Sequence, residues 1–130
     1  MESRVISSTV PQLADLPRMT AVELTALRNA RIDDPFELAR YSPDGLAAES
    51  DLDEQSARRL VETARLVTLR GIGTRHARAL VELDVLTVCD LARRDSAALY
   101  ASVSERRPGH RPTPAETRVW IRAAARRCPP

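Results

Sequence analysis

The stretch that decides the fold spans residues 69–77 and reads LRGIGTRHA. Gly71 and Gly73 flank Ile72, and glycine permits positive φ angles while leaving no side chain to keep a ligand backbone away. We expect Ile72 to point inward and anchor the turn, and Thr74 to cap the helix that follows. The stretch therefore predicts a tight hairpin between two helices.

The start of the second helix is a candidate site for anions. We expect the amides of Gly73, Thr74 and Arg75 to point outward there, where free amides and the helix dipole bind phosphate oxygens. Three arginines lie close enough in sequence to add positive charge. The candidate nucleic-acid-binding residues are Arg70, Gly71, Ile72, Gly73, Thr74, Arg75 and Arg78.

This hairpin lies in the second of two similar halves. A shift of 53 positions aligns Leu16, Met19, Leu27, Ile32, Leu38, Ala39, Arg40 and Leu46 with Leu69, Ile72, Leu80, Val85, Leu91, Ala92, Arg93 and Leu99. Most of these matches are apolar, as a duplicated core requires. We predict a lead-in over 1–15, a first unit over 16–66 and a second unit over 67–130, packed as one compact all-α domain.

Capping residues predict where the helices begin. The patterns are Thr20 with Glu23, Asp33 and Asp34 before Pro35, Ser42 before Pro43, Thr87 with Asp90, and Thr113 and Pro114 with Glu116. The expected helices include 20–30, 53–66, 96–103 and a closing helix that reaches Arg127. Residues 104–112 are expected to form the longest loop because they are rich in Arg, Pro and Gly.

Composition favours helices and a reducing compartment. Of the 130 residues 43% are hydrophobic but only 3% aromatic, so the core is expected to consist of Leu, Val, Ile and Ala. No apolar run approaches the roughly 20 residues that span a bilayer, and residues 1–10 lack a signal-peptide pattern, so we expect a cytoplasmic protein without membrane contact. Cys89 and Cys128 have neither zinc-site nor disulfide-framework spacing, and Cys89 aligns with Phe36, so we expect it in the core.

Charge is divided unevenly between the halves. Residues 1–65 carry 8 Arg against 12 acidic residues, a net charge of −4, whereas residues 66–130 carry 12 Arg against 6, a net charge of +6. The second half is therefore the better candidate for an anionic partner, although the acidic half could also complement it within the fold or in a dimer. All 20 basic residues are Arg, which fits either bidentate phosphate recognition or a GC-rich genome.

The hairpin resembles the helix-hairpin-helix motif of DNA repair and recombination proteins. That motif reads apolar, any residue, Gly, apolar, Gly, and the residues here that match it are Gly71, Ile72, Gly73, Ala77 and Leu80. The resemblance implies that hairpin amides bind a phosphate of duplex DNA without sequence preference. In the first unit Pro17, Arg18 and Thr20 replace the glycine pattern, so we expect weak binding there and an overall affinity near the non-specific range of roughly 10⁻⁴ to 10⁻⁶ M.

The whole chain resembles DUF4332, a family of uncharacterised bacterial proteins that pairs two such units. The likeness is carried by the segment from Leu69 through Val85, Thr87, Leu91 and Ala92, and by the closing Val119, Trp120, Ile121 and Ala124. It implies a fold of two helix-hairpin-helix repeats, the first degenerate and the second intact, rather than a particular function.

Two functions remain open. One is a non-enzymatic accessory protein that binds duplex DNA through the hairpin, with Arg106, Arg107 and Arg111 adding attraction. The other is a protein-interaction module that docks a partner enzyme through the acidic first unit or the Trp120 helix. Trp120 is expected to be packed, His76 to be a partly exposed surface residue, and His110 to have no catalytic partner, so we expect no enzyme activity, cofactor or metal.

Overall fold

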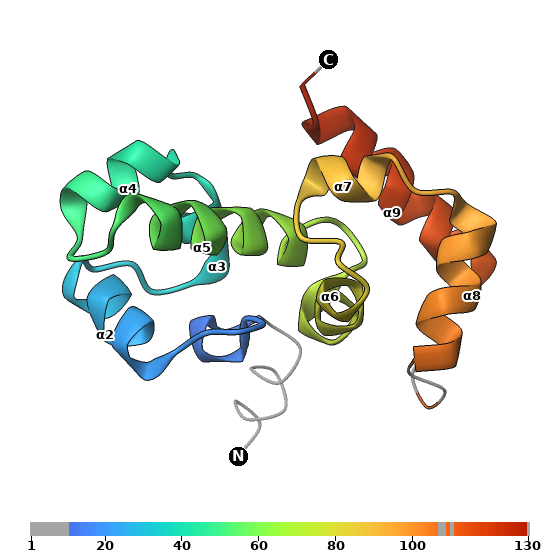
Figure 1. Cartoon of the computed structure of the whole chain (residues 1–130), viewed down its shortest axis with the longest axis horizontal. Helices are drawn as coiled ribbons and strands as arrows, with labels where there is room; N and C mark the ends of the chain where they lie inside the picture. The colour runs from blue at the N-terminus through green and yellow to red at the C-terminus, as the bar shows by residue number, and fades with distance from the viewer. Residues whose placement is uncertain (1–10, 107–108, 110, 130) are drawn as a thin grey trace, which may run out of the picture.

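The fold consists of helices joined by short turns (Figure 1). The computed structural model describes residues 11–106, 109 and 111–129. Within them lie the 3-10 helix η1 and eight α-helices, and these described residues contain no strand. The elements are η1 (Leu13–Asp15), α2 (Ala21–Asn29), α3 (Pro35–Ala39), α4 (Pro43–Glu49), α5 (Glu54–Val67), α6 (Gly73–Glu82), α7 (Val88–Ala92), α8 (Ser96–Arg106) and α9 (Pro114–Arg127). The predicted all-α class is confirmed.

Local capping explains where most of these helices begin. Thr20, Thr87 and Thr113 each form a capping box with the acidic residue three positions later. Asp34 and Ser42 accept a hydrogen bond from a first-turn amide, as predicted for α3 and α4, and Asp53 does the same for α5. Helix α8 begins in the same way, since the Asp95 carboxylate accepts from the Ala98 amide, but it runs on to Arg106 instead of ending at 103. The loop predicted to begin at 104 is therefore shorter than expected.

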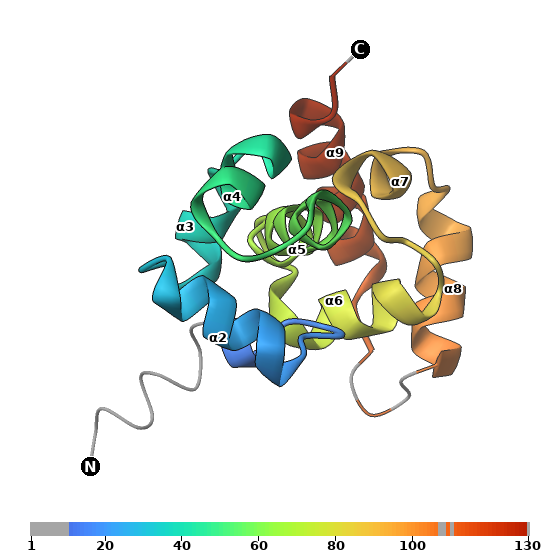
Figure 2. The ribbon, with the colours of Figure 1, turned by 60° about the vertical axis from the view of Figure 1, so that its left-hand side comes forward.

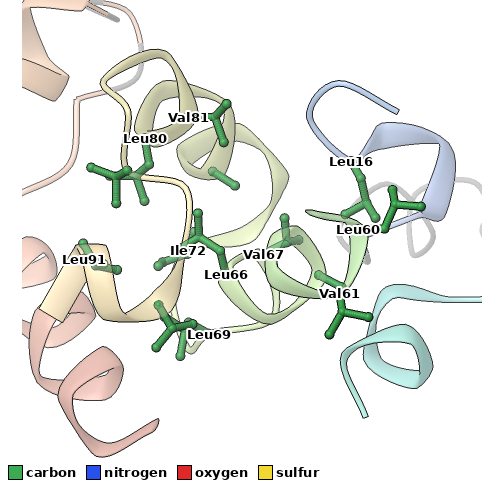
Figure 3. Packing of buried hydrophobic residues seen from close by; sticks show 14 of the residues in the cluster. Leu16, Leu60, Val61, Leu66, Val67, Leu69, Ile72, Leu80, Val81 and Leu91 are labelled. Atoms are coloured by element: carbon green, nitrogen blue, oxygen red, sulfur yellow. The ribbon is translucent and has the colours of Figure 1, made fainter. Parts of the chain in front are cut away.

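Helix α5 forms the centre of the molecule. Half of its fourteen residues are buried, and it packs against α3 and α4 on one side and α6 and α7 on the other (Figure 2). The buried cluster is mainly aliphatic, as the low aromatic content predicts, and its members come from η1 through α9. Figure 3 shows its central part, from Leu16 to Leu91. Trp120 of α9 is its one aromatic member and is fully buried, so the prediction that Trp120 is packed is confirmed.

Backbone geometry repeats at the predicted 53-residue interval. Arg31 and Asp84 have positive φ angles of 64° and 63°. The turns that follow α2 and α6 are closed by the same bond, from the Ile32 amide to the Leu27 carbonyl at 3.0 Å and from the Val85 amide to the Leu80 carbonyl at 2.9 Å. Equivalent positions in the two halves therefore adopt the same turn despite their different side chains.

The two cysteines contradict the sequence-based expectation. Cys89 at the start of α7 and Cys128 after α9 form a disulfide, with Cα atoms 5.0 Å apart across 39 residues of sequence. The prediction of unpaired cysteines is wrong because α9 packs on α7 and returns Cys128 to Cys89, a contact that spacing along the chain does not reveal. Disulfides are rare in reducing compartments, so the cysteines no longer argue for one.

Phe36, which aligns with Cys89, is also not in the core. Its side chain lies on the first turn of α3 and is 49% exposed. Burial at this part of α3 is provided by Pro35 and Leu38 instead. The expectation that Cys89 lies in the core is therefore wrong, since Cys89 is only partly buried and the position it aligns with is exposed.

Candidate nucleic-acid interface

The glycine hairpin joins the end of α5 to the start of α6. The Ile72 amide donates to the Leu69 carbonyl at 3.2 Å, and Gly71 and Gly73 have φ angles of +84° and +64°. Ile72 is 3% exposed and lies in the core cluster beside Leu66 and Leu69 (Figure 3). The predicted inward anchor is confirmed, and the backbone on either side of it is turned by glycine.

The first turn of α6 has no side-chain cap. The N-cap residue is Ile72, which cannot accept a hydrogen bond, so the prediction that Thr74 caps this helix is wrong. Thr74 lies inside the helix because Gly73 is its first residue. The amides of Gly73 and Thr74 have no intrahelical acceptor at this position, as at any helix start. No side chain of α6 caps these two amides.

A surface hollow of about 650 Å³ follows the hairpin. Its wall is the continuous stretch 67–76, with Pro11, Asp15 and Phe36 contributing from the first half. Six of the seven predicted site residues line it together: Arg70, Gly71, Ile72, Gly73, Thr74 and Arg75. The side chains of Arg70 and Arg75 are exposed at its edge.

Arg78 lies apart from this hollow. Its Nη2 donates to the Asp15 carbonyl at 3.4 Å, and its side chain lines a different depression beside residues 16–19. The structure therefore places Arg78 against the first hairpin rather than with the second. Sequence proximity suggested the wrong neighbour because Arg78 lies on the second turn of α6, next to the lead-in.

Trp120 of α9 packs against the buried side of the glycine hairpin and bonds to it. Its Nε1–H donates to the Gly71 carbonyl at 3.2 Å, and its ring lies 4.7 Å from the ring of His76, centroid to centroid. Nδ1 of His76 in turn lies 3.1 Å from the Ile72 carbonyl oxygen. Sequence reasoning placed Trp120 in the core but missed this bond. The available signal was that a buried indole N–H requires an acceptor.

The first hairpin uses its polar groups internally. Arg18 has a φ angle of +62°, as Gly71 does, but Thr20 is extended at −98° where Gly73 is left-handed. The Thr20 hydroxyl accepts from the Glu23 amide and the Glu23 carboxylate accepts from the Thr20 amide, both at 3.1 Å. As the sequence suggested, this hairpin offers fewer amides to a ligand.

Glu23 also carries an ion pair with Arg59 of α5. Burial acts to raise the pKa of the Glu23 carboxyl, but the hydrogen bonds from Arg59 and Thr20, together with the charge of Arg59, outweigh it. The pKa is therefore lowered from its ordinary value of 4.5. The first hairpin is fixed by a charged group that the second lacks.

The described part of the chain has neither a metal-binding cluster nor a membrane-spanning helix. It contains no group of three or more His, Cys, Asp or Glu side chains that could hold a metal ion. Among the same residues, no helix combines the length and the apolar character needed to cross a bilayer. Arg107 and His110 lie outside the described residues, and Arg106 and Arg111 are exposed on either side of them.

These features define an all-helical protein with an arginine-flanked glycine hairpin that is backed by a buried tryptophan. A family model described as "Domain of unknown function (DUF4332)" matches residues 17–127. The chain belongs to this family, and the match includes both halves and the closing helix. No curated protein and no solved structure matched the chain.

Proposed function

We propose that this is a non-enzymatic accessory protein that binds the nucleic-acid backbone, without sequence preference, through the hairpin at 71–75. The observation that carries the proposal is the open space beside Gly73. A Cβ added there would meet no atom within 4 Å, so packing leaves this position open, and its φ angle of +64° favours glycine. A glycine in such a place suits the close approach of a ligand backbone.

The comparison with the first half strengthens this argument. Arg18 adopts the φ angle that Gly71 adopts, so this turn does not depend on glycine. Gly73 differs, because it is left-handed where Thr20 of the first half is extended, and the helix that begins at Gly73 has no side-chain cap. Duplex DNA supplies the anion that such amides bind, and Arg70 and Arg75 add attraction that salt would screen.

We further propose that the two halves are diverged helix-hairpin-helix units over 16–66 and 67–130. Support comes from the turns that repeat at the 53-residue interval and from α5 and α9, which close the two halves in the same order. In this interpretation the first unit stabilises the fold and the second contacts the ligand. Neither enzyme activity nor a cofactor is part of the proposal.

The test is fluorescence anisotropy of a labelled duplex and a labelled single strand, at low and near-physiological salt. We expect salt-sensitive micromolar binding by the native protein, and a loss of about tenfold or more in Gly73→Ala, because the added methyl group blocks the approach to the amides. Gly109→Ala controls for the added methyl group alone, since its Cβ also meets no atom within 4 Å but Gly109 does not share the positive φ angle of Gly73. Circular dichroism and thermal unfolding of both variants measure the backbone strain that Ala introduces at Gly73. A folded Gly73→Ala protein that binds duplex as tightly as the control would refute the hairpin mechanism.

The alternative is a protein-interaction module for a partner enzyme, with the hairpin purely structural. One observation favours it, since Val22 is 78% exposed and Phe36 is 49% exposed, both in the acidic half. Trp120 itself is fully buried and cannot be a docking anchor. If the native protein does not bind nucleic acid at low salt, this alternative becomes the better one, and Val22→Ser and Phe36→Ser variants would then be compared in co-purification.

A further inference from the structure

Helix α9 presents a row of arginines on its outer face. Arg118, Arg122 and Arg126 follow one another at four-residue intervals, which places them on one side of a helix, and all three are exposed. The opposite side of α9 carries Thr117, Trp120 and Ala124, which are buried. The helix therefore uses its apolar face for the core and turns its charged face outward.

Arg70 of the hairpin joins this row. A hollow of about 290 Å³ is lined by Arg70, Val119, Arg122, Ala123 and Arg126, and no acidic residue contributes to it. The bond between Trp120 and the Gly71 carbonyl fixes the relative positions, since it ties the residue after Arg70 to the middle of α9. The hairpin and α9 thus form one continuous positive surface.

The charge on this surface is not neutralised within the described part of the chain, where neither Arg70, Arg122 nor Arg126 makes an ion pair. Helix α9 contains a single acidic residue, Glu116, and its carboxylate accepts a hydrogen bond from the Thr113 amide in the capping box. Three exposed arginines around one hollow repel one another, so an anionic ligand would relieve this repulsion.

We propose that Arg70, Arg122 and Arg126 bind backbone phosphates of the nucleic acid held by the hairpin, so that the duplex runs along α9. This inference rests on the proposed function. Arg122 and Arg126 are about 6 Å apart along the helix axis, and each strand of duplex DNA carries a phosphate about every 3.4 Å, so the two can contact different phosphates. The α9 face then supplies the contacts that the degenerate first hairpin lacks.

The surface fits nucleic acid better than other polyanions. A basic helix that binds a lipid surface inserts its apolar face, but the apolar face of α9 is buried in the core. Protein interfaces use aromatic and aliphatic anchors at their centre. Apart from Ala123, the hollow has a single apolar lining residue, the exposed Val119. Closely spaced guanidinium groups instead match phosphate geometry through bidentate hydrogen bonds.

The test compares two double variants with equal loss of charge. Arg122→Ala/Arg126→Ala removes the α9 contacts, and Arg28→Ala/Arg40→Ala removes two exposed arginines from the first half. Anisotropy with a labelled duplex is measured over a salt series for both, with circular dichroism to establish folding. The logarithmic salt slope should fall by about 1.8 in the α9 variant, since each lost phosphate contact contributes about 0.9, and should stay near the native value in the control.

The outcomes separate this inference from the proposed function. Equal slopes in the α9 variant and the control would overturn the α9 assignment, and a loss confined to Gly73→Ala would then leave the hairpin as the binding site. A reduced slope in the α9 variant with unchanged binding by Gly73→Ala would support α9 and refute the hairpin. Equal binding of polyglutamate or anionic phospholipid vesicles, or no duplex binding at low salt, would overturn the inference.

Discussion

The two hairpins of this protein follow the same backbone path but differ in what they leave unsatisfied. Arg18 and Gly71 share a left-handed conformation, and the bonds from Met19 to Leu16 and from Ile72 to Leu69 are both 3.2 Å. The first hairpin then closes on itself through the capping box of Thr20 and Glu23. The second begins its helix at Gly73 without a side-chain cap. Under the proposed function, the same turn stabilises the fold in the first half and admits a ligand in the second.

Helices α5 and α9, which close the two halves, also differ in how they support the hairpins. Leu60 of α5 and Trp120 of α9 are both fully buried, but only Trp120 can donate a hydrogen bond to a hairpin. The first hairpin is held by its own capping box and by Arg59, whereas the second is held by Trp120 of α9. The second hairpin can therefore keep its amides available and still be rigid.

The largest effect is expected from Trp120→Ala. It removes a fully buried aromatic side chain and the bond to the Gly71 carbonyl, which should lower the free energy of unfolding by about 3–5 kcal/mol. Trp120→Phe keeps most of the packing and should cost less, mainly through the lost hydrogen bond. Denaturant unfolding measures both. If both variants were as stable as the native protein, the tryptophan would not support the hairpin.

The disulfide should produce the second largest effect. Only the second half has this covalent link, between the start of α7 and the end of α9. Cys89→Ser/Cys128→Ser, or reduction, should lower the free energy of unfolding by about 2–4 kcal/mol, because the bond restricts the unfolded chain across 39 residues. Thermal unfolding with and without reductant measures the change. An equal effect of reductant on the native protein and the double variant would contradict this account.

Thr20 and Thr74 should differ although both lie beside a hairpin. Thr20→Ala removes a capping hydroxyl and should cost about 1 kcal/mol of stability. Thr74→Ala removes no cap and should leave the unfolding midpoint in denaturant unchanged, because the hydroxyl of Thr74 caps nothing in α6. Comparable losses in the two variants would mean that the second helix is capped after all.

The smallest expected effect is a pH dependence of stability, which arises in the first hairpin through Glu23. The folded-state pKa of Glu23 is below its ordinary value of 4.5, so its contribution to stability is present above that value and is lost as pH falls through the folded pKa. Stability of the native protein should therefore fall on acidification below about pH 4.5 more steeply than that of Glu23→Gln. Parallel pH profiles of the two proteins in thermal unfolding would exclude the ion pair with Arg59 as the cause.

Local signals in the sequence predicted most of the helix starts and the inward position of Ile72, because caps and hairpins depend on residues a few positions apart. The contacts that the sequence missed join distant segments. They include the disulfide of Cys89 with Cys128, the bond of Trp120 to Gly71 and the bond of Arg78 to Asp15. The arginine row of α9 was visible as a four-residue repeat, but its neighbour Arg70 could be identified only from the packed structure.

The most direct test of the account is the amide signals of the two hairpins in a ¹H–¹⁵N NMR titration with a short duplex. The account predicts the largest shifts at Gly73 and Thr74, with smaller shifts along the outer face of α9. The amide of Thr20 should not move, because it donates to Glu23. Shifts centred on residues 17–20, or no shift at Gly73 while the duplex is bound, would contradict the claim that the second hairpin is the binding site.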